Sequence, residues 1–296
     1  MEALVGRAPE KFAMAYNADD ILSQAAEGKI SIAMGMENGA PIEGDLANLH
    51  RFYQRGIRYI TLAHSRSNHL ADSSYDINRP WKGLSPFGEV VVKEMNRLGI
   101  MIDISHISDQ ASLAVMALTK APVIASHSSV RKYTPGWERN ISDELIKKVG
   151  ENGGVVQINF GSTFVSGVSR AYQEKLTEAR TAFMEAQSIA DQDDERVVAF
   201  VEDYKTKAPF AYATLEDVLN NFDHVVGLVG VEHVGIGSDY DGVGDSLPID
   251  LKDVSSYPNL IRGLLARGYT EADIKKIMFE NTLRVWKTVE QVAQES

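Results

Sequence analysis

Two short apolar runs in this chain each end at a histidine. Residues 100–105 lead into His106, and residues 122–126 lead into His127. A run of five or six residues that is apolar at nearly every position is typical of a strand buried on both faces, as in a parallel sheet under helices. A third run, 58–63, ends at His64 in the same way. Because the carboxyl ends of parallel barrel strands share one face, the pattern predicts that the three imidazoles lie on that face.

Segments with helical periodicity alternate with these runs. Serine caps at Ser85, Ser108 and Ser142, and threonine caps at Thr214 and Thr270, mark the starts of helices. Residues from Met1 to Gly28 are also expected to be helical. We predict strands at 30–36, 58–63, 100–105, 122–126, 154–160 and 233–238, with a seventh in 209–230. The alternation predicts an α/β fold, a TIM-like (β/α)8 barrel forming a single domain over residues 1–296.

The stretch 164–207 departs from this rhythm. It is long, rich in alanine, glutamate, glutamine and arginine, and interrupted by an acidic run at 191–195. We expect a helical excursion on the barrel rim. A lid, a contact in a homodimer and a plain solvated helix pair are all open interpretations of it.

The overall composition excludes several kinds of site. The formal net charge is −11 and no lysine/arginine-rich run occurs, which argues against a nucleic-acid or anionic-membrane surface. The chain contains no cysteine, so a metal must be held by histidine, aspartate and glutamate. No apolar run approaches the roughly 20 residues of a membrane span. Neither a signal peptide nor a membrane anchor is visible, and the compartment stays open.

Carboxylates also follow predicted strands. Glu37 ends the first one, between two glycines, and Asp239 follows the last one. A carboxylate at the end of a buried strand is costly unless it is paired or bound to a metal. For Glu37 alone, a solvated turn is an equal alternative, and a lone histidine in a loop is usually only hydrogen-bonded. Several such groups on one barrel face favour a metal site, with His69 outside it as a loop residue.

Taken together, the strand ends resemble one known family. The motifs are Gly-Met-Glu37-Asn-Gly, Leu-Ala-His64, Asp-Ile-Ser-His106, Ala-Ser-His127-Ser, Glu-Arg139-Asn140, Gly-Ser-Asp239-Tyr-Asp-Gly and the closing Glu-Asn-Thr-Leu-Arg-Val at 280–285. In this order they are similar to the membrane dipeptidases, also called renal dipeptidases. These are binuclear zinc enzymes with a (β/α)8 barrel of the amidohydrolase type.

The resemblance implies a role for each matching residue. Glu37 would bridge two zinc ions, and His106 and His127 would complete the second zinc site. His64 and Arg139 would orient the substrate, with Asn140 beside them. Asp239 would bind the free amino group of a dipeptide and relay a proton to the leaving amine.

One part of the family pattern is absent. The family holds its first zinc with a His-x-Asp pair upstream of the bridging glutamate, and none of the seven histidines here is followed two residues later by aspartate. We therefore expect a barrel without its first strand, which binds one zinc where the family binds two.

The leading hypothesis is a zinc-dependent dipeptidase, complete or impaired by N-terminal truncation, that hydrolyses free dipeptides through a metal-activated hydroxide. Two alternatives stay open. One is another metal-dependent amidohydrolase acting on a lactone, a phosphoester or an acylated amino acid, and the other is an inactive barrel that binds a peptide or one metal. The preferred side chains and the tolerance of a D-residue are not set by the sequence.

Overall fold

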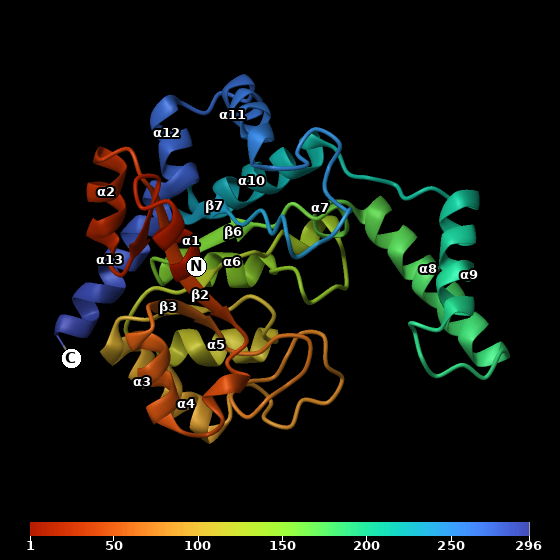
Figure 1. Ribbon diagram of the computed structural model, residues 1–296, viewed down its shortest axis with the longest axis horizontal. Helices are drawn as coiled ribbons and strands as arrows, with labels where there is room; N and C mark the ends of the chain where they lie inside the picture. The colour runs from red at the N-terminus through yellow and green to blue at the C-terminus, as the bar shows by residue number, and fades with distance from the viewer. Residues whose placement is uncertain (296) are drawn as a thin grey trace.

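Seven parallel strands curl into an open half-barrel in the computed structural model, which describes residues 1–295 (Figure 1). Each strand pairs with the next one along the chain, from β1 to β7. The strands are β1 (Phe12–Ala15), β2 (Ile30–Glu37), β3 (Ile57–Thr61), β4 (Met101–Asp103), β5 (Ile124–Ala125), β6 (Val155–Ile158) and β7 (Val234–Ile236). The α/β class and the TIM-like architecture expected from the sequence are confirmed.

Helices cover the outer face of the half-barrel. Those that follow the strands are α2 (Ala18–Ala26), α3 (Leu46–Gln54), α4 (Pro86–Leu98), α5 (Asp109–Leu118), α6 (Asp143–Glu151) and α10 (Leu215–Val229). Helix α1 (Glu2–Arg7) precedes β1, and after β7 come α11 (Tyr257–Ala266), α12 (Glu271–Lys275), a π-helical turn (Lys276–Glu280) and α13 (Asn281–Gln294). The five predicted caps are confirmed, because each hydroxyl accepts a hydrogen bond from a backbone N–H in the first turn of its helix.

The six predicted strands are present, but two predictions about the remainder are wrong. Residues 209–230 hold no strand; α10 fills most of that stretch, starts at a capping box and buries Val218, Phe222 and Val225. The seventh strand is β1, inside the segment expected to be helical. Alanine and methionine favour a helix by propensity, but pairing of Phe12–Ala15 with Ile30–Ala33 of β2 overrides that preference.

The barrel is not closed in the part of the chain that the structure describes, since β1 and β7 each pair with a single neighbour. Side chains of β2 on one face are consequently exposed, including Ala33 and Glu37. A largely apolar cavity of about 330 Å³ lies between the sheet and α13. Its lining includes Met34, Tyr59 and Trp286.

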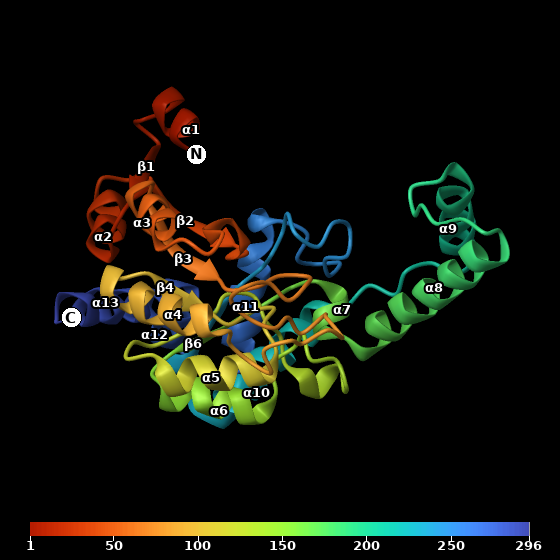
Figure 2. The same ribbon diagram turned by 90° about the horizontal axis from the view of Figure 1, so that it is seen from below.

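The stretch 164–207 forms a helical hairpin that extends away from the barrel (Figures 1 and 2). After the short helix α7 (Ser162–Val165), α8 (Gly167–Ala186) runs outward and α9 (Glu195–Lys207) returns beside it. Phe183 and Phe200 stack between them with ring centroids 4.4 Å apart. Over residues 1–295, neither this hairpin nor any other helix is long and apolar enough to cross a membrane.

Candidate active site

The candidate side chains lie at the carboxyl ends of neighbouring strands. Glu37 is the last residue of β2, and His64, His106 and His127 follow β3, β4 and β5 within three residues. Asp239 follows β7 at the same distance. The predicted clustering of the strand-end groups is thus present in the structure.

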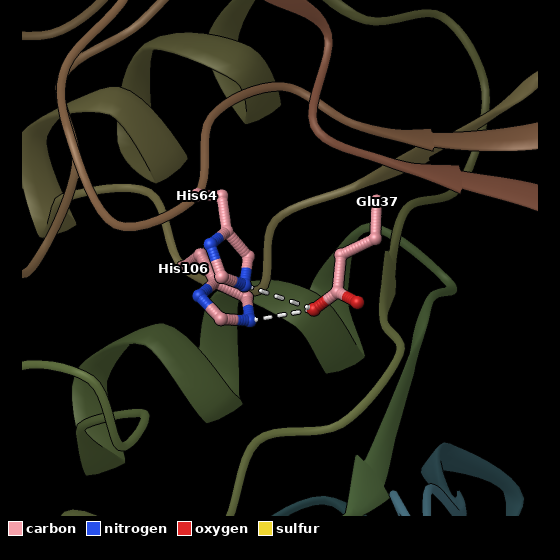
Figure 3. Close-up of side chains that lie close together, drawn as sticks. All are labelled: Glu37, His64 and His106. Carbon is pink, nitrogen blue, oxygen red and sulfur yellow. Dashed lines mark ion pairs between the residues drawn. The ribbon is translucent and has the colours of Figure 1, made fainter. Parts of the chain in front are cut away.

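One carboxylate oxygen of Glu37 faces all three imidazoles. Glu37 Oε1 lies 2.9 Å from His106 Nε2, 3.0 Å from His127 Nε2 and 3.5 Å from His64 Nε2. The Nε2 atoms of His106 and His127 are 2.7 Å apart. Figure 3 shows His64 and His106 stacked on each other, with both rings directed at Glu37; their centroids are 4.2 Å apart.

Burial and neighbouring groups shift the pKa values of this cluster. Hydrogen bonding with His106 and then with His127 holds the pKa of Glu37 well below its usual range. Burial lowers the pKa of His106 to about 3, so this imidazole is neutral near pH 7. Burial raises the pKa of Asp239, although His127 and a hydrogen bond from Asn159 oppose that shift.

A cation among these atoms resolves a mismatch at His106. Its Nε2 faces a Glu37 oxygen, which accepts hydrogen bonds, and also the guanidinium of Arg139 at 3.0 Å, which donates them. Neither neutral tautomer of His106 satisfies both neighbours. A metal ion held by His106 Nε2 and Glu37 Oε1 would remove the mismatch, because neither atom would then need a hydrogen. Arg139 Nη2 would still donate to the backbone oxygen of His127 at 2.9 Å. The donor set, two imidazoles and a carboxylate with a third imidazole beside them, fits zinc.

Arg139 lies fully inside the protein beside this cluster. Its Nη1 donates to Ser128 Oγ at 2.9 Å, and its Nε has no partner. Burial lowers the pKa of Arg139, but a guanidinium stays charged in proteins. The side chain therefore brings a positive charge and a spare donor to the wall of the site.

Asn140 does not share this position. It is fully buried, and its Nδ2 donates to Thr134 Oγ1 and to the backbone oxygen of Phe164, both at 2.7 Å. Asn140 is absent from the lining of the cavity, so the structure does not support the predicted contact of Asn140 with substrate. Its side chain connects the loop that carries Arg139 to α7. The side chain of Arg139 itself lines the cavity.

A cavity of about 360 Å³ connects Glu37, His64, His106, Arg139 and Asp239, while His127 is not part of its lining. Its lining comprises Glu37, His64, Ser65, Tyr75, His106, Arg139, Thr163, Phe164, Gln173, Asp239, Gly242, Val243 and Ser246. Gln173 comes from α8, so the base of the helical hairpin forms part of the wall.

The carboxylate of Asp239 is fixed from two sides. Asn159 Nδ2 donates to Asp239 Oδ2 at 2.8 Å. On the other side, a Cβ atom at Gly242 would lie 1.9 Å from Asp239 Oδ1, so only glycine leaves room for the carboxylate. The backbone of Asp239 has φ +57°, in the left-handed region, and that of His106 has φ +68°. Both positions carry backbone strain of a kind that clusters at functional sites.

We expect Gly242→Ala to displace the Asp239 carboxylate and to lower turnover while the metal stays bound. The methyl group cannot be accommodated without moving Oδ1, whereas Glu37 and the histidines lie on other strands. Activity and zinc content of the purified variant are the measurements. Gly227→Ala is the matched control, since a Cβ there meets nothing within 4 Å and residue 227 lies in α10. Full turnover in Gly242→Ala would show that close contact at position 242 does not fix the Asp239 carboxylate.

Sequence patterns did not single out several residues that support the site. Asp103 interrupts an apolar run and Ser126 directly precedes His127, so both positions carried a weak signal. Asn159 and Gln173 carried none, because their places depend on contacts between segments far apart in the chain.

Comparison with known proteins agrees with this arrangement. The family model for membrane dipeptidases, peptidase family M19, matches residues 1–296. The chain belongs to the membrane dipeptidase family. An uncharacterized dipeptidase of Schizosaccharomyces pombe is 37% identical over 278 residues, which cover 93% of this chain and 57% of that relative. The chain thus spans little more than half the length of this relative.

Solved structures of a probable dipeptidase and of a metallopeptidase have the same fold. The probable dipeptidase PvdM from Pseudomonas aeruginosa superposes with a TM-score of 0.85 at 30% identity, over 99% of this chain and 77% of PvdM. A metallopeptidase from Rhodobacter sphaeroides, solved with a phosphinate mimic of the dipeptide L-Ala-D-Ala, gives a TM-score of 0.77 at 26% identity, over 97% of this chain and 72% of that chain.

Proposed function

We propose that residues 1–296 act as one metal-dependent dipeptidase unit that cleaves free dipeptides. The observation that carries this proposal is the convergence of His106 and His127 on one oxygen of Glu37, beside a cavity that Glu37, His106, Arg139 and Asp239 line. A metal-binding group beside a carboxylate and a guanidinium matches the two charged ends of a free dipeptide. Membership in the membrane dipeptidase family supports the same reaction.

Glu37, His106 and His127 would hold one zinc ion, with His64 close by. Three protein ligands leave a fourth position for water, the arrangement of catalytic zinc sites. Zinc bound there supplies a Lewis acid that polarises a carbonyl and lowers the pKa of water. Over residues 1–295, the one group of three or more histidine and carboxylate side chains placed to hold a metal is Glu37, His64 and His106, and His127 Nε2 lies 3.0 Å from the same Glu37 oxygen. A single cluster around one carboxylate oxygen supports one zinc per chain rather than two.

The protein residues would orient the peptide and handle its proton. Arg139 pairs with the C-terminal carboxylate of the substrate, and a buried guanidinium does so strongly because little water competes. Asp239 neutralises the free ammonium and transfers a proton to the leaving amine, a role that a pKa raised by burial favours. His64, which is partly exposed and stacked on His106, contacts the scissile carbonyl.

A cavity with a charge at each end restricts the length of the substrate. A longer peptide would leave either Arg139 or Asp239 facing an uncharged amide, and an unpaired buried charge costs binding energy. N-acylated dipeptides lack the free ammonium, so they also leave Asp239 facing an uncharged amide and should bind weakly. The mimic of L-Ala-D-Ala in the Rhodobacter sphaeroides structure is a reason to test dipeptides with a D-residue at the second position.

A panel of substrates tests the proposed function. The zinc-loaded protein is assayed on free L,L- and L,D-dipeptides, their N-acetyl forms, tripeptides, a lactone and a phosphoester. We expect turnover of free dipeptides alone, abolished in Glu37→Gln. Cleavage of the lactone or N-acyl substrates would favour another amidohydrolase, and zinc binding without any turnover would favour an inactive metal-binding barrel.

Arg139→Ala is expected to weaken substrate binding more than metal binding. A hydrogen bond between charged groups contributes roughly 1.5–3 kcal/mol, so KM should rise about tenfold to a hundredfold. Zinc content and KM are measured together. Arg267→Ala is the control, because Arg267 is an ion-paired arginine that lies, like its partners Glu216 and Asp223, outside the cavity. Loss of zinc in proportion to activity in Arg139→Ala would contradict the anchoring role.

A further inference from the structure

We propose that Asp103 and Ser126 form a hydrogen-bonded relay that keeps a proton on His127 Nδ1 and so presents His127 Nε2 to the metal. The inference rests on the proposed metal site and adds positioning residues to it. Neither Asp103 nor Ser126 lines the cavity around the candidate ligands.

The relay begins at a carboxylate whose acceptor positions are filled. Asp103, the last residue of β4, is completely buried. Its Oδ1 accepts from the backbone N–H groups of Ser105 at 3.0 Å and Ser126 at 2.9 Å. Its Oδ2 accepts from Thr61 Oγ1 at 2.5 Å and Ser126 Oγ at 2.6 Å. These four bonds join the ends of three adjacent strands and fix the carboxylate in place.

The direction of the next bond follows from the number of protons available. Ser126 Oγ also contacts His127 Nδ1 at 2.7 Å. A serine hydroxyl has one hydrogen, and a carboxylate only accepts, so the hydroxyl donates to Asp103. His127 Nδ1 must then be the donor in its contact with Ser126. In the neutral ring this places the lone pair on Nε2, the atom that would bind zinc together with Glu37 Oε1, which lies 3.0 Å away.

The arrangement is a serine-mediated form of a contact common in metal sites. Metal-binding histidines usually donate their other N–H to a carboxylate or a carbonyl, which sets the tautomer and the ring orientation. Here Ser126 bridges the gap between Asp103 and the ring. Changes to such supporting groups typically lower metal affinity about 10- to 100-fold.

An isosteric substitution of the carboxylate reverses the relay. In Asp103→Asn the amide oxygen can accept from the two backbone N–H groups, and the NH2 group then donates to Thr61 and Ser126. The Ser126 hydroxyl is left to donate to His127 Nδ1, so the ring proton moves to Nε2 and occupies the metal position. Ser126→Ala removes the bridge without reversing it. Asp103→Asn should therefore reduce zinc affinity more than Ser126→Ala does.

The decisive comparison is a double-mutant cycle on zinc affinity, measured by competition with a chelator. Asp103 acts through Ser126, so Asp103→Asn should have no further effect in the Ser126→Ala background. Ser129→Ala is the matched control; Ser129 is also buried, but it donates to the backbone oxygen of Asn159 and not to a histidine. Thermal unfolding of each metal-free variant shows whether it folds. Equal losses in both backgrounds would mean that Asp103 is merely structural and would overturn the relay.

Nitrogen NMR of the metal-free protein tests the relay independently of zinc. With 15N-labelled histidine, and with His127 assigned by comparison with His127→Gln, we expect Nδ1 of His127 to carry a proton in the wild type and none in Asp103→Asn. An unprotonated Nδ1 in the wild type overturns the relay even if the variants fail to fold. A wild-type chain that binds no zinc would overturn the proposed function instead, and the NMR result would still decide the relay.

Discussion

Asp239→Asn is expected to lower turnover of a free dipeptide by roughly 10²–10⁴-fold, the usual contribution of general acid–base catalysis, with fold and zinc content unchanged. The change is nearly isosteric, and the new amide oxygen can still accept from Asn159, which now bonds to Asp239 Oδ2. Its NH2 group would then face the cavity, where it can neither neutralise the substrate ammonium nor deliver a proton as a carboxylic acid does.

The measurements are kcat and KM on one dipeptide, zinc content and the circular dichroism spectrum. Binding of a phosphinate dipeptide mimic, followed by calorimetry, reports on the ammonium contact even where turnover is slow. Asp241→Asn serves as control, since Asp241 lies two residues further on and outside the cavity lining. Near-normal turnover in Asp239→Asn would move the proposed role to Asp241.

The zinc content of the purified chain is expected to be about one per molecule, because three protein ligands suffice for a catalytic-type site. A second tight site needs several donors beyond Glu37, His106 and His127, and over residues 1–295 the further histidine facing the same Glu37 oxygen is His64 alone, at 3.5 Å. A lone metal cannot share a hydroxide between two ions, so dipeptidase turnover should be low. Elemental analysis gives the count, and Glu37→Gln should bring it close to zero.

Two outcomes would test the expected zinc content and the expected turnover separately. Two tightly held zinc ions with full turnover would show that the one-metal prediction is wrong. Conversely, one tightly held zinc ion with full turnover would show that the expected low turnover is wrong. His50→Gln is a suitable control, because His50 pairs with Glu94 away from the cavity.

The apolar runs were sufficient to predict six strands, since a strand buried on both faces leaves a continuous hydrophobic signal. The edge strand β1 was missed for the opposite reason: it has four residues, of which only Ala15 is buried. The strand ends likewise predicted which groups meet, because parallel strands place their carboxyl ends together.

Side-chain direction was harder to predict than position. Asn140 is adjacent to Arg139 in sequence, yet its side chain turns into the protein and bonds to Thr134 and Phe164. His64 was expected to face the substrate only, and the structure also places its Nε2 3.5 Å from Glu37. The contacts of Asp103 join three strands, and no local pattern encodes such a set.

The left-handed backbone at Asp239 narrows which amino acids can serve there. Aspartate, asparagine and glycine tolerate this conformation best, whereas β-branched residues are true outliers in it. Of the tolerant residues, only aspartate carries a carboxylate. Glutamate keeps the charge, but its longer side chain would bring the carboxylate past the space between Asn159 and Gly242. Conformation and chemistry thus select the same residue independently, and a conservative exchange at this position should be as damaging as a radical one.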